Sequence, residues 1–305
     1  MTTILVGVDA SERSADAVAF AHRLAETSRA DVLVAATYPY DDRPSRMANR
    51  AFRDELEHDA KATVERLAKP LRDLGAERVR TTVFARLSPP HGLQELAEAE
   101  QAAVIVVGSS HVGAVGRVLP GSTAERLLHG APCPVAVAPR DYRTTAHAFR
   151  RIGVAFDGSD ESGAALDASV ALARAGRAEL RVIGVAEVLA YGSPAFMVGR
   201  AFVAARDDYE RSASLELVDV VDGLPGDVAA EAVFRVGDPA GEIAAQTGDL
   251  DLLVTGSRGY GPLAAVLLGG VTGRLLRQAA CPVLIVPRGV ATPLAPLFGP
   301  REVPA

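Results

Sequence analysis

The chain has 305 residues, of which 49% are hydrophobic and 5% aromatic, and its net charge is −6. The basic residues are nearly all arginines and are scattered along the chain, which argues against nucleic acid as a partner. Two cysteines are too few for a disulfide framework, and no apolar run has the length of a membrane span or the form of a leader. We therefore expect a cytoplasmic protein that does not bind membranes.

The first half predicts strands alternating with helices. A buried strand over 4–8 ends at Asp9, and the spacing of apolar residues after it predicts a helix over 14–28. The elements expected next are a strand over 32–36, an amphipathic helix over about 48–74, a strand over 80–84, a helix near 93–100, an apolar strand over 103–107, and a final helix and strand.

The second half repeats this order, beginning with a strand over 152–156, a helix over 162–176 and a strand over 180–185. Landmark residues of the two halves are separated by 148 positions (157 − 9), and no gap is needed between them. They are Asp9 and Asp157, Gly108 and Gly256, Gly121 and Gly269, and Cys133 and Cys281. The chain is thus a tandem repeat of one domain, and we expect two compact cores.

The alternation of strands and helices predicts the fold class and the domain limits. It is typical of an α/β protein, in which a parallel sheet is covered by helices on both faces and ligands bind beyond the carboxyl ends of the strands. We place an N-terminal domain at 1–143, a C-terminal domain at 150–288, a short linker over about 141–149 and a Pro-rich tail at 289–305.

A glycine pattern follows the fourth predicted strand of the second half. Gly256 and Gly259 are followed, after nine residues, by Gly269, then by a helix-forming stretch and a Cys-Pro-Val sequence. With the Asp-x-Ser turn after the first strand of each half, this order resembles the universal stress protein family in its tandem two-domain form. The resemblance covers nearly the whole chain. It implies two Rossmann-like domains of the adenine nucleotide alpha hydrolase type, each with a five-stranded parallel sheet flanked by helices.

Glycines let backbone N–H groups approach an anion closely, and a helix that begins at the end of such a loop adds its positive end. The resemblance implies an ATP site, with Mg²⁺ accompanying the nucleotide, in which the strand-one Asp and the end of strand two hold the adenosine and the glycine loop holds the phosphates. Carried over to the second half, it implicates Asp157, Val185, Gly256, Arg258, Gly259, Gly269, Gly270, Val271 and Thr272. In the first half it implicates Asp9, Thr37, Gly108, His111, Gly121, Ser122 and Thr123.

Neither half matches the loop pattern fully. The first half has His111 at the position of the second glycine, where a side chain is costly in a left-handed conformation. The second half has Gly270 where Ser or Thr is usual, which removes a hydroxyl but keeps the backbone donor. We therefore expect the C-terminal site to bind ATP better than the N-terminal site.

Simpler roles are open for several of these residues. Asp9 and Asp157 stand at strand-to-helix turns, where an Asp commonly caps the helix that follows. Cys133 and Cys281 each precede a proline at the start of a strand and are expected to be small buried hydrophobic residues.

The sequence carries no signature of efficient turnover. It has no G-x4-G-K-[ST] loop and no acidic cluster to hold a metal, so we assign no catalytic residue and no protein metal site. We expect a nucleotide-dependent sensor or regulator of the stress response that binds ATP with little or no hydrolysis. The alternatives are a scaffold that has lost nucleotide binding and an adenylating or ATP-hydrolysing enzyme.

The last strand of each half is an apolar edge candidate. These segments, 134–138 and 282–286, are expected to pair within one chain, so that the two domains form a pseudo-dimer. We also expect a homodimer of whole chains and a protein partner whose identity the sequence does not give.

Overall fold

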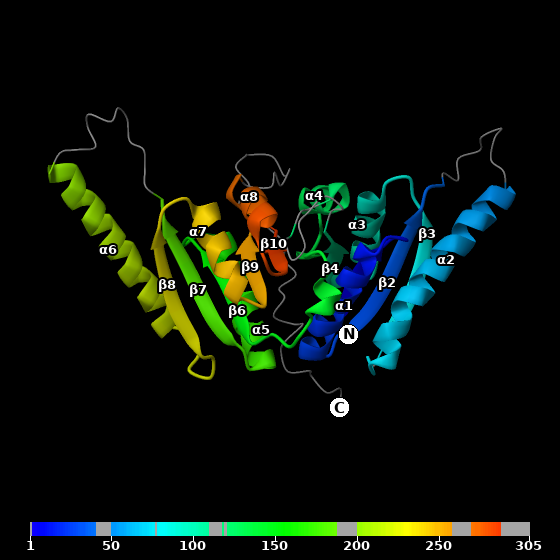
Figure 1. Cartoon of the computed structure of the whole chain (residues 1–305), viewed down its shortest axis with the longest axis horizontal. Helices are drawn as coiled ribbons and strands as arrows, with labels where there is room; N and C mark the ends of the chain where they lie inside the picture. Colours follow the sequence, from blue (N-terminus) through cyan, green and yellow to red (C-terminus); the bar gives the residue numbers. More distant parts are fainter. Residues whose placement is uncertain are drawn as a thin grey trace.

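Figure 1 shows the computed structural model of the chain, which describes residues 2–40, 50–76, 78–109, 118, 121–187, 200–257 and 270–287, with the backbone alone over 200–205. None of the helices within these ranges is long and apolar enough to cross a membrane. The start expected for the long helix near residue 48 and the tail over 289–305 lie outside the described residues.

The first half alternates strands with helices in the predicted order. The strands are β1 (Thr3–Val8), β2 (Asp31–Tyr38), β3 (Val79–Ala85), β4 (Ala102–Gly108) and β5 (Val135–Ala138). The helices are α1 (Arg13–Ser28), α2 (Arg50–Asp73), α3 (Pro89–Ala99) and α4 (Ser122–Leu128).

The second half has the same arrangement, after a short 3-10 turn over Tyr142–Thr144. Its strands are β6 (Arg151–Phe156), β7 (Glu179–Ala186), β8 (Ala230–Val236), β9 (Leu252–Gly256) and β10 (Val283–Val286). Its helices are α5 (Asp160–Gly176), α6 (Arg200–Asp222), α7 (Pro239–Gln246) and α8 (Gly270–Gln278), and a 3-10 turn over Thr247–Asp249 precedes β9.

All ten strands form one sheet, in the order β3-β2-β1-β4-β5-β10-β9-β6-β7-β8. Pairing is parallel within each half and antiparallel where β5 meets β10, with Ala136 opposite Leu284. Figure 1 shows the two halves on either side of this seam, with α2 and α6 at the outer ends. The predicted α/β fold and the pairing of the last strands within one chain are both present.

A shift of 148 positions superposes most strands of the first half on those of the second half, residue for residue. It carries β1 onto β6, β2 onto β7 and β5 onto β10. The outer strands depart from it, because β3 begins at Val79 and β8 at Ala230, which is a separation of 151 positions (230 − 79). The expectation of a gap-free register therefore fails between the second and fourth strands, where the second half carries three extra residues before β8.

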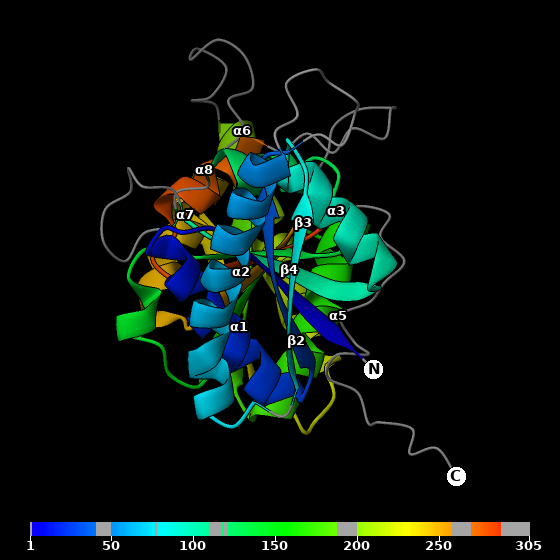
Figure 2. The same cartoon turned by 90° about the vertical axis from the view of Figure 1, so that its right-hand side faces the viewer.

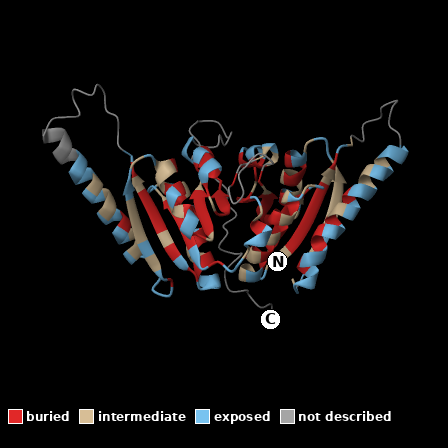
Figure 3. Ribbon diagram, in the orientation of Figure 1, coloured by how far each residue is buried: buried red, intermediate tan, exposed pale blue. Residues whose placement is uncertain are grey.

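The core divides by face of the sheet and not by half. Alternate residues of each strand point to opposite faces, so Ile4 and Ile152 join one buried cluster while Leu5 and Leu253 join the other. Figure 2 shows α1 and α2 on one side of the strands and α3 on the other, and Figure 3 shows the strands near the seam as the most buried part. The expected pair of separate cores is wrong, because the sheet continues through the seam and both clusters continue with it.

The linker is held against α1 by one buried carboxylate and three aromatic rings. Asp16, which is 2% exposed, accepts hydrogen bonds from the backbone N–H of Asp141 at 2.9 Å and of Arg143 at 3.0 Å. Phe20 makes edge contacts with the rings of Tyr142 and Phe149, at centroid distances of 5.6 Å and 6.0 Å. These contacts fix the path of the chain between the two halves.

Replacing Asp16 by Ala should lower the free energy of unfolding by about 2–4 kcal/mol, because two backbone N–H groups of the linker lose their acceptor in a buried place. Urea unfolding of the full chain measures the change. Asp167→Ala, at an exposed position of α5, is the control and should stay within about 0.5 kcal/mol of the parent. Equal effects of the two substitutions would contradict the role of Asp16.

His22 is a second buried polar group on α1. Its Nε2 lies 3.3 Å from Glu26, and its Nδ1 has no hydrogen-bond partner among the described residues. Burial lowers the pKa of His22, and the attraction of Glu26 offsets this only in part. The folded protein therefore favours the neutral ring.

Acidification should destabilise the protein through His22, because the unfolded chain gains a proton near the ordinary histidine pKa of about 6.5 and the folded chain gains it only at lower pH. We expect the midpoint of urea unfolding to fall between pH 7.5 and 5.5, and to fall less in His22→Val, which copies Val170 of the second half. Identical pH dependence in both proteins would refute this assignment.

Candidate ligand-binding site

Each half contains the place where an open α/β sheet binds ligands. In the first half β1 and β4 are neighbours, and the chain runs outward from β1 to β2 and β3 on one side and from β4 to β5 on the other. A crevice opens between the carboxyl ends of two such strands, because the connections that follow them leave toward opposite faces of the sheet. The neighbouring strands β6 and β9 form the corresponding place in the second half.

A cavity of about 310 Å³ lies at this point in the first half. Its apolar part is lined by Ala35, Leu93 and Val107. The remaining lining residues come from strand ends, from the turns that follow them and from the starts of α1, α3 and α4, and they are mostly small or polar: Gly7, Val8, Asp9, Ser11, Arg13, Ser14, Thr37, Pro89, Gly108, Gly121, Ser122, Thr123 and Ala124.

Six of the seven residues predicted for the first half line this single cavity. They come from four separate places in the chain: the ends of β1, β2 and β4, and the start of α4. The six are Asp9, Thr37, Gly108, Gly121, Ser122 and Thr123. The seventh, His111, lies outside the described residues.

Asp9 stands at the centre of a hydrogen-bond network on the rim of the cavity. Its Oδ1 accepts from the backbone N–H of Ser11 at 2.9 Å, from the Ser11 hydroxyl, and from the Ser14 hydroxyl at 2.9 Å. Its Oδ2 accepts from Nη2 of Arg13 at 3.2 Å. Burial raises the pKa of Asp9, but the hydrogen bonds from Ser11 and Ser14 and the charge of Arg13 outweigh it and hold the pKa below its ordinary value. The carboxylate is therefore ionised at neutral pH.

The two strand-one aspartates do not cap the helices that follow them. The N-cap of α1 is Glu12, without a side-chain hydrogen bond, and the N-cap of α5 is Ser159, whose hydroxyl accepts from the backbone N–H of Ser162 at 3.3 Å. Asp157 instead accepts from the backbone N–H of Ser159 at 3.0 Å. The simpler reading as helix caps is wrong, since the aspartates orient the turn before each helix.

In the second half the structure describes six of the nine predicted residues. Asp157 and Val185 end β6 and β7 as Asp9 and Thr37 do in the first half, and Gly256 ends β9. Thr272 is 3% exposed and its hydroxyl donates to the carbonyl of Gly256 at 3.3 Å, so it joins α8 to β9. Gly270 and Val271 begin α8, whereas Arg258, Gly259 and Gly269 lie outside the described residues.

Gly108 and Gly256 are required by close backbone packing. A Cβ atom at Gly108 would lie 2.6 Å from the carbonyl oxygen of Arg13, and one at Gly256 would lie 2.8 Å from the carbonyl oxygen of Glu161. The start of α1 therefore rests on the end of β4, and the start of α5 rests on the end of β9. These contacts set the position of the turn that carries the strand-one Asp.

Arg13 also lines the cavity but is not among the predicted residues, and it lies there beside Ser14 and Ser11, the serine of the Asp-x-Ser turn. The comparison of halves does contain a signal for Arg13, since the 148-residue shift places Glu161 at its position. The two cysteines are buried, as expected: Cys133 is 1% and Cys281 3% exposed. Burial raises the pKa of Cys133 to about 12 and that of Cys281 further.

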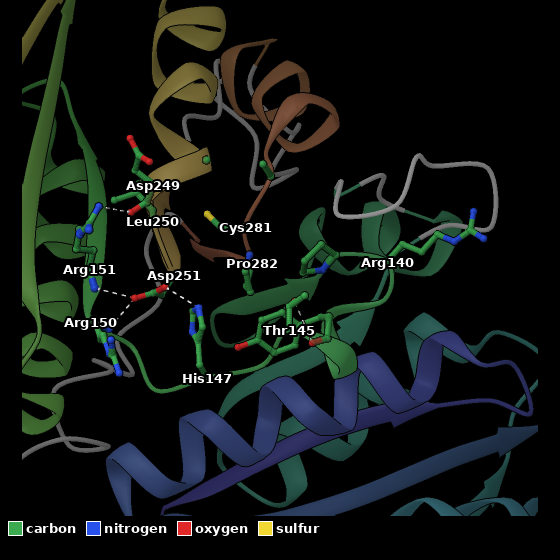
Figure 4. Close-up of a pocket in the computed structure, with 14 residues that line it drawn as sticks. Arg140, Thr145, His147, Arg150, Arg151, Asp249, Leu250, Asp251, Cys281 and Pro282 are labelled. Atoms are coloured by element: carbon green, nitrogen blue, oxygen red, sulfur yellow. Dashed lines mark hydrogen bonds and ion pairs between the residues drawn. The ribbon is translucent and has the colours of Figure 1, made fainter.

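A larger cavity, of about 490 Å³, lies at the seam beside the linker. Figure 4 shows Asp251 at its centre, bonded to the backbone N–H groups of Arg150 and Arg151 at 2.6 Å and 2.8 Å and paired with His147 at 3.4 Å. Arg140 points away from this group (Figure 4). Because the Asp251 carboxylate is engaged with the linker and the first residue of β6, we read its contacts as structural.

Comparison with known proteins identifies the family of the chain. The model of the universal stress protein family matches residues 1–139 and 148–287. The chain belongs to the universal stress protein family. A family member from Mycobacterium tuberculosis is 31% identical over 205 residues, which cover 67% of this chain and 70% of the relative. Another, from Mycolicibacterium smegmatis, is 29% identical over 295 residues and covers 93% of this chain and 96% of its own length.

Solved structures share this fold over nearly the whole chain. A universal stress protein from Archaeoglobus fulgidus superposes with a TM-score of 0.65 at 20% identity, covering 94% of this chain and 96% of the other. A protein described as functionally unknown, from Pseudomonas aeruginosa, superposes with a TM-score of 0.64 at 17% identity over 97% and 94% of the two chains. At these identities the likeness establishes the fold.

Gly108→Ala should destabilise the protein by about 1–3 kcal/mol, because the new methyl group meets backbone that cannot rotate away. Gly163→Ala is the matched control: a Cβ there meets nothing within 4 Å, and Ala inside α5 should stabilise the helix by roughly 0.5–1 kcal/mol. Urea unfolding of both variants tests the pair. Gly108→Ala with unchanged or raised stability would refute the packing argument.

Proposed function

We propose that the cavity of the first half binds an adenine nucleotide, with ATP as the ligand and Mg²⁺ as its accompanying ion. The observation that carries this proposal is the convergence of Asp9, Thr37, Gly108 and the first residues of α4 on one cavity at the switch point between β1 and β4. The family resemblance in sequence implicates the same positions, although they lie far apart along the chain.

The residues present fit such a ligand. The volume of about 310 Å³ lies at the lower end of the range of small-molecule sites, about 300–1,000 Å³. Ala35, Leu93 and Val107 offer an apolar surface for a flat base, and the carboxylate of Asp9 offers an acceptor for hydroxyl or amino groups of a nucleoside. The hydroxyls of Ser122 and Thr123 line the same cavity and supply donors for phosphate oxygens.

We extend the proposal to the second half, with Asp157, Val185 and Gly256 in the corresponding places. Each half, over 1–143 and 150–288, is then one nucleotide-binding domain. The predicted contacts of His111, Arg258, Gly259 and Gly269 remain part of this proposal. The protein acts as a sensor or regulator whose state depends on nucleotide occupancy, and a homodimer of whole chains is a further part of the proposal.

Calorimetric titration of the nucleotide-stripped full chain with Mg·ATP tests the function. Thr37→Phe should abolish detectable binding in the first half, because a phenyl ring at the end of β2 occupies a cavity of this size. Val185→Phe is the matched variant and should remove only the binding of the second half.

The number of sites per chain in the parent, in each single variant and in the double variant shows which halves bind. Circular dichroism and urea unfolding of the same proteins show that the fold is retained. A parent protein that binds no ATP would overturn the proposal and favour the scaffold alternative. ATP binding that survives in the double variant with a native fold would place the ligand elsewhere.

A further inference from the structure

One position beside the two sites carries opposite charges in the two halves. Arg13 is the first residue of α1, and Glu161, 148 positions later (161 − 13), is the second residue of α5. The turns before these helices are similar, since each turn carries an Asp followed two positions later by a Ser. The halves therefore differ here by two units of charge within closely related backbone.

The packing of the glycines shows that the two residues occupy the same place. A Cβ at Gly108 would meet the backbone carbonyl and the Cβ of Arg13, at 2.6 Å and 3.1 Å. A Cβ at Gly256 would meet the same two atoms of Glu161, both at 2.8 Å. Each residue thus lies against the glycine that ends the fourth strand of its half, which is Gly108 in β4 and Gly256 in β9.

Arg13 is held at the rim of the first-half cavity by contacts with both strand ends. Its Nη2 donates to Asp9 at 3.2 Å, its Nε to the hydroxyl of Ser11 at 3.1 Å, and its Nη1 to the carbonyl of Ser109 at 3.4 Å. The side chain is 25% exposed and lines the cavity. The guanidinium group therefore bridges the end of β1 and the residue that follows β4.

The guanidinium group of Arg13 has more donors than its described partners accept. It has five N–H donors, and its hydrogen bonds to described residues use one on each nitrogen, so within the described part of the chain one N–H on Nη1 and one on Nη2 have no acceptor. Arginine binds phosphate oxygens well because its planar group keeps its charge and presents several donors in a fixed geometry. Held as it is here, Arg13 meets the ligand without first losing much side-chain freedom.

We propose that Arg13 makes the first half selective for phosphorylated ligands, and that Glu161, in the same place, makes the second half favour ligands of lower charge. This inference rests on the proposed adenylate function of both halves. The first half would take ATP or ADP through its phosphates. The second would bind adenosine or AMP with a smaller penalty from the carboxylate of Glu161, so the two halves of one chain would respond to different members of the adenylate pool.

This assignment differs from what the glycine loops alone predict. The loop pattern favours ATP binding in the second half, whereas the charge beside the strand-one Asp favours it in the first. The two predictions separate when each half is measured alone. Val185→Phe isolates the first half within the full chain, and Thr37→Phe isolates the second.

The experiment is a set of calorimetric titrations with adenosine, AMP, ADP and ATP. With the second half blocked by Val185→Phe, Arg13→Gln should raise the Kd for ATP roughly tenfold, because a charged hydrogen bond to the ligand is lost. The Kd for adenosine should change less than about twofold. Arg13→Lys, which keeps the charge, should recover part of the loss. With the first half blocked by Thr37→Phe, Glu161→Gln should increase the affinity for ATP relative to the affinity for adenosine. Glu161→Arg should increase this ratio further.

The outcomes are distinct. If Arg13→Gln weakens the binding of ATP and of adenosine equally, Arg13 acts only by holding Asp9 in place, and the inference is wrong. If Glu161→Arg leaves the ratio of ATP to adenosine affinity unchanged, the charge difference does not set ligand preference and the inference is again wrong. If neither half binds any of the four compounds, the proposed function itself fails, and this inference fails with it. Unfolding midpoints of all variants confirm that the comparison is between folded proteins.

Discussion

The antiparallel pairing of β5 with β10 is the contact on which the rest of the architecture depends. Each of these strands would be the edge of a five-stranded parallel sheet, with an apolar ladder open to solvent. Pairing them hides both edges and makes one sheet of ten strands, so the buried layers on its two faces run through from one half to the other. The linker contacts of Asp16 and Phe20 hold the connecting chain against this joined core.

The same duplication gives two crevices with a shared framework and different rims. In both, the glycine at the end of β4 or β9 admits the backbone at the start of α1 or α5, and an Asp accepts hydrogen bonds from its own turn. The framework is therefore repeated where backbone packing demands it. The side-chain charges differ at Arg13 and Glu161, although the backbone of both residues takes part in the same packing.

Much of the fold could be predicted from the sequence, because the apolar strands and the glycine and aspartate landmarks recur in register. The different separation of β3 and β8 could not be predicted. These outer strands contain none of the landmark residues that align the two halves, so the alignment in this region is set only by residues outside the strands. The joining of the two cores also escaped prediction. Alternating apolar residues show that both faces of a strand are buried, but they do not show that two sheets meet edge to edge.

The candidate site was predictable where a residue's position follows from the strand end it occupies, as for Asp9, Thr37 and Gly108. It was not predictable for Arg13, whose place on the rim depends on Ser109, 96 positions away.

Fusing the two halves in one chain makes their association independent of how much protein the cell contains. Two separate subunits would come apart at low copy number, whereas here the linker keeps the partner at a fixed local concentration, so the seam persists at any expression level.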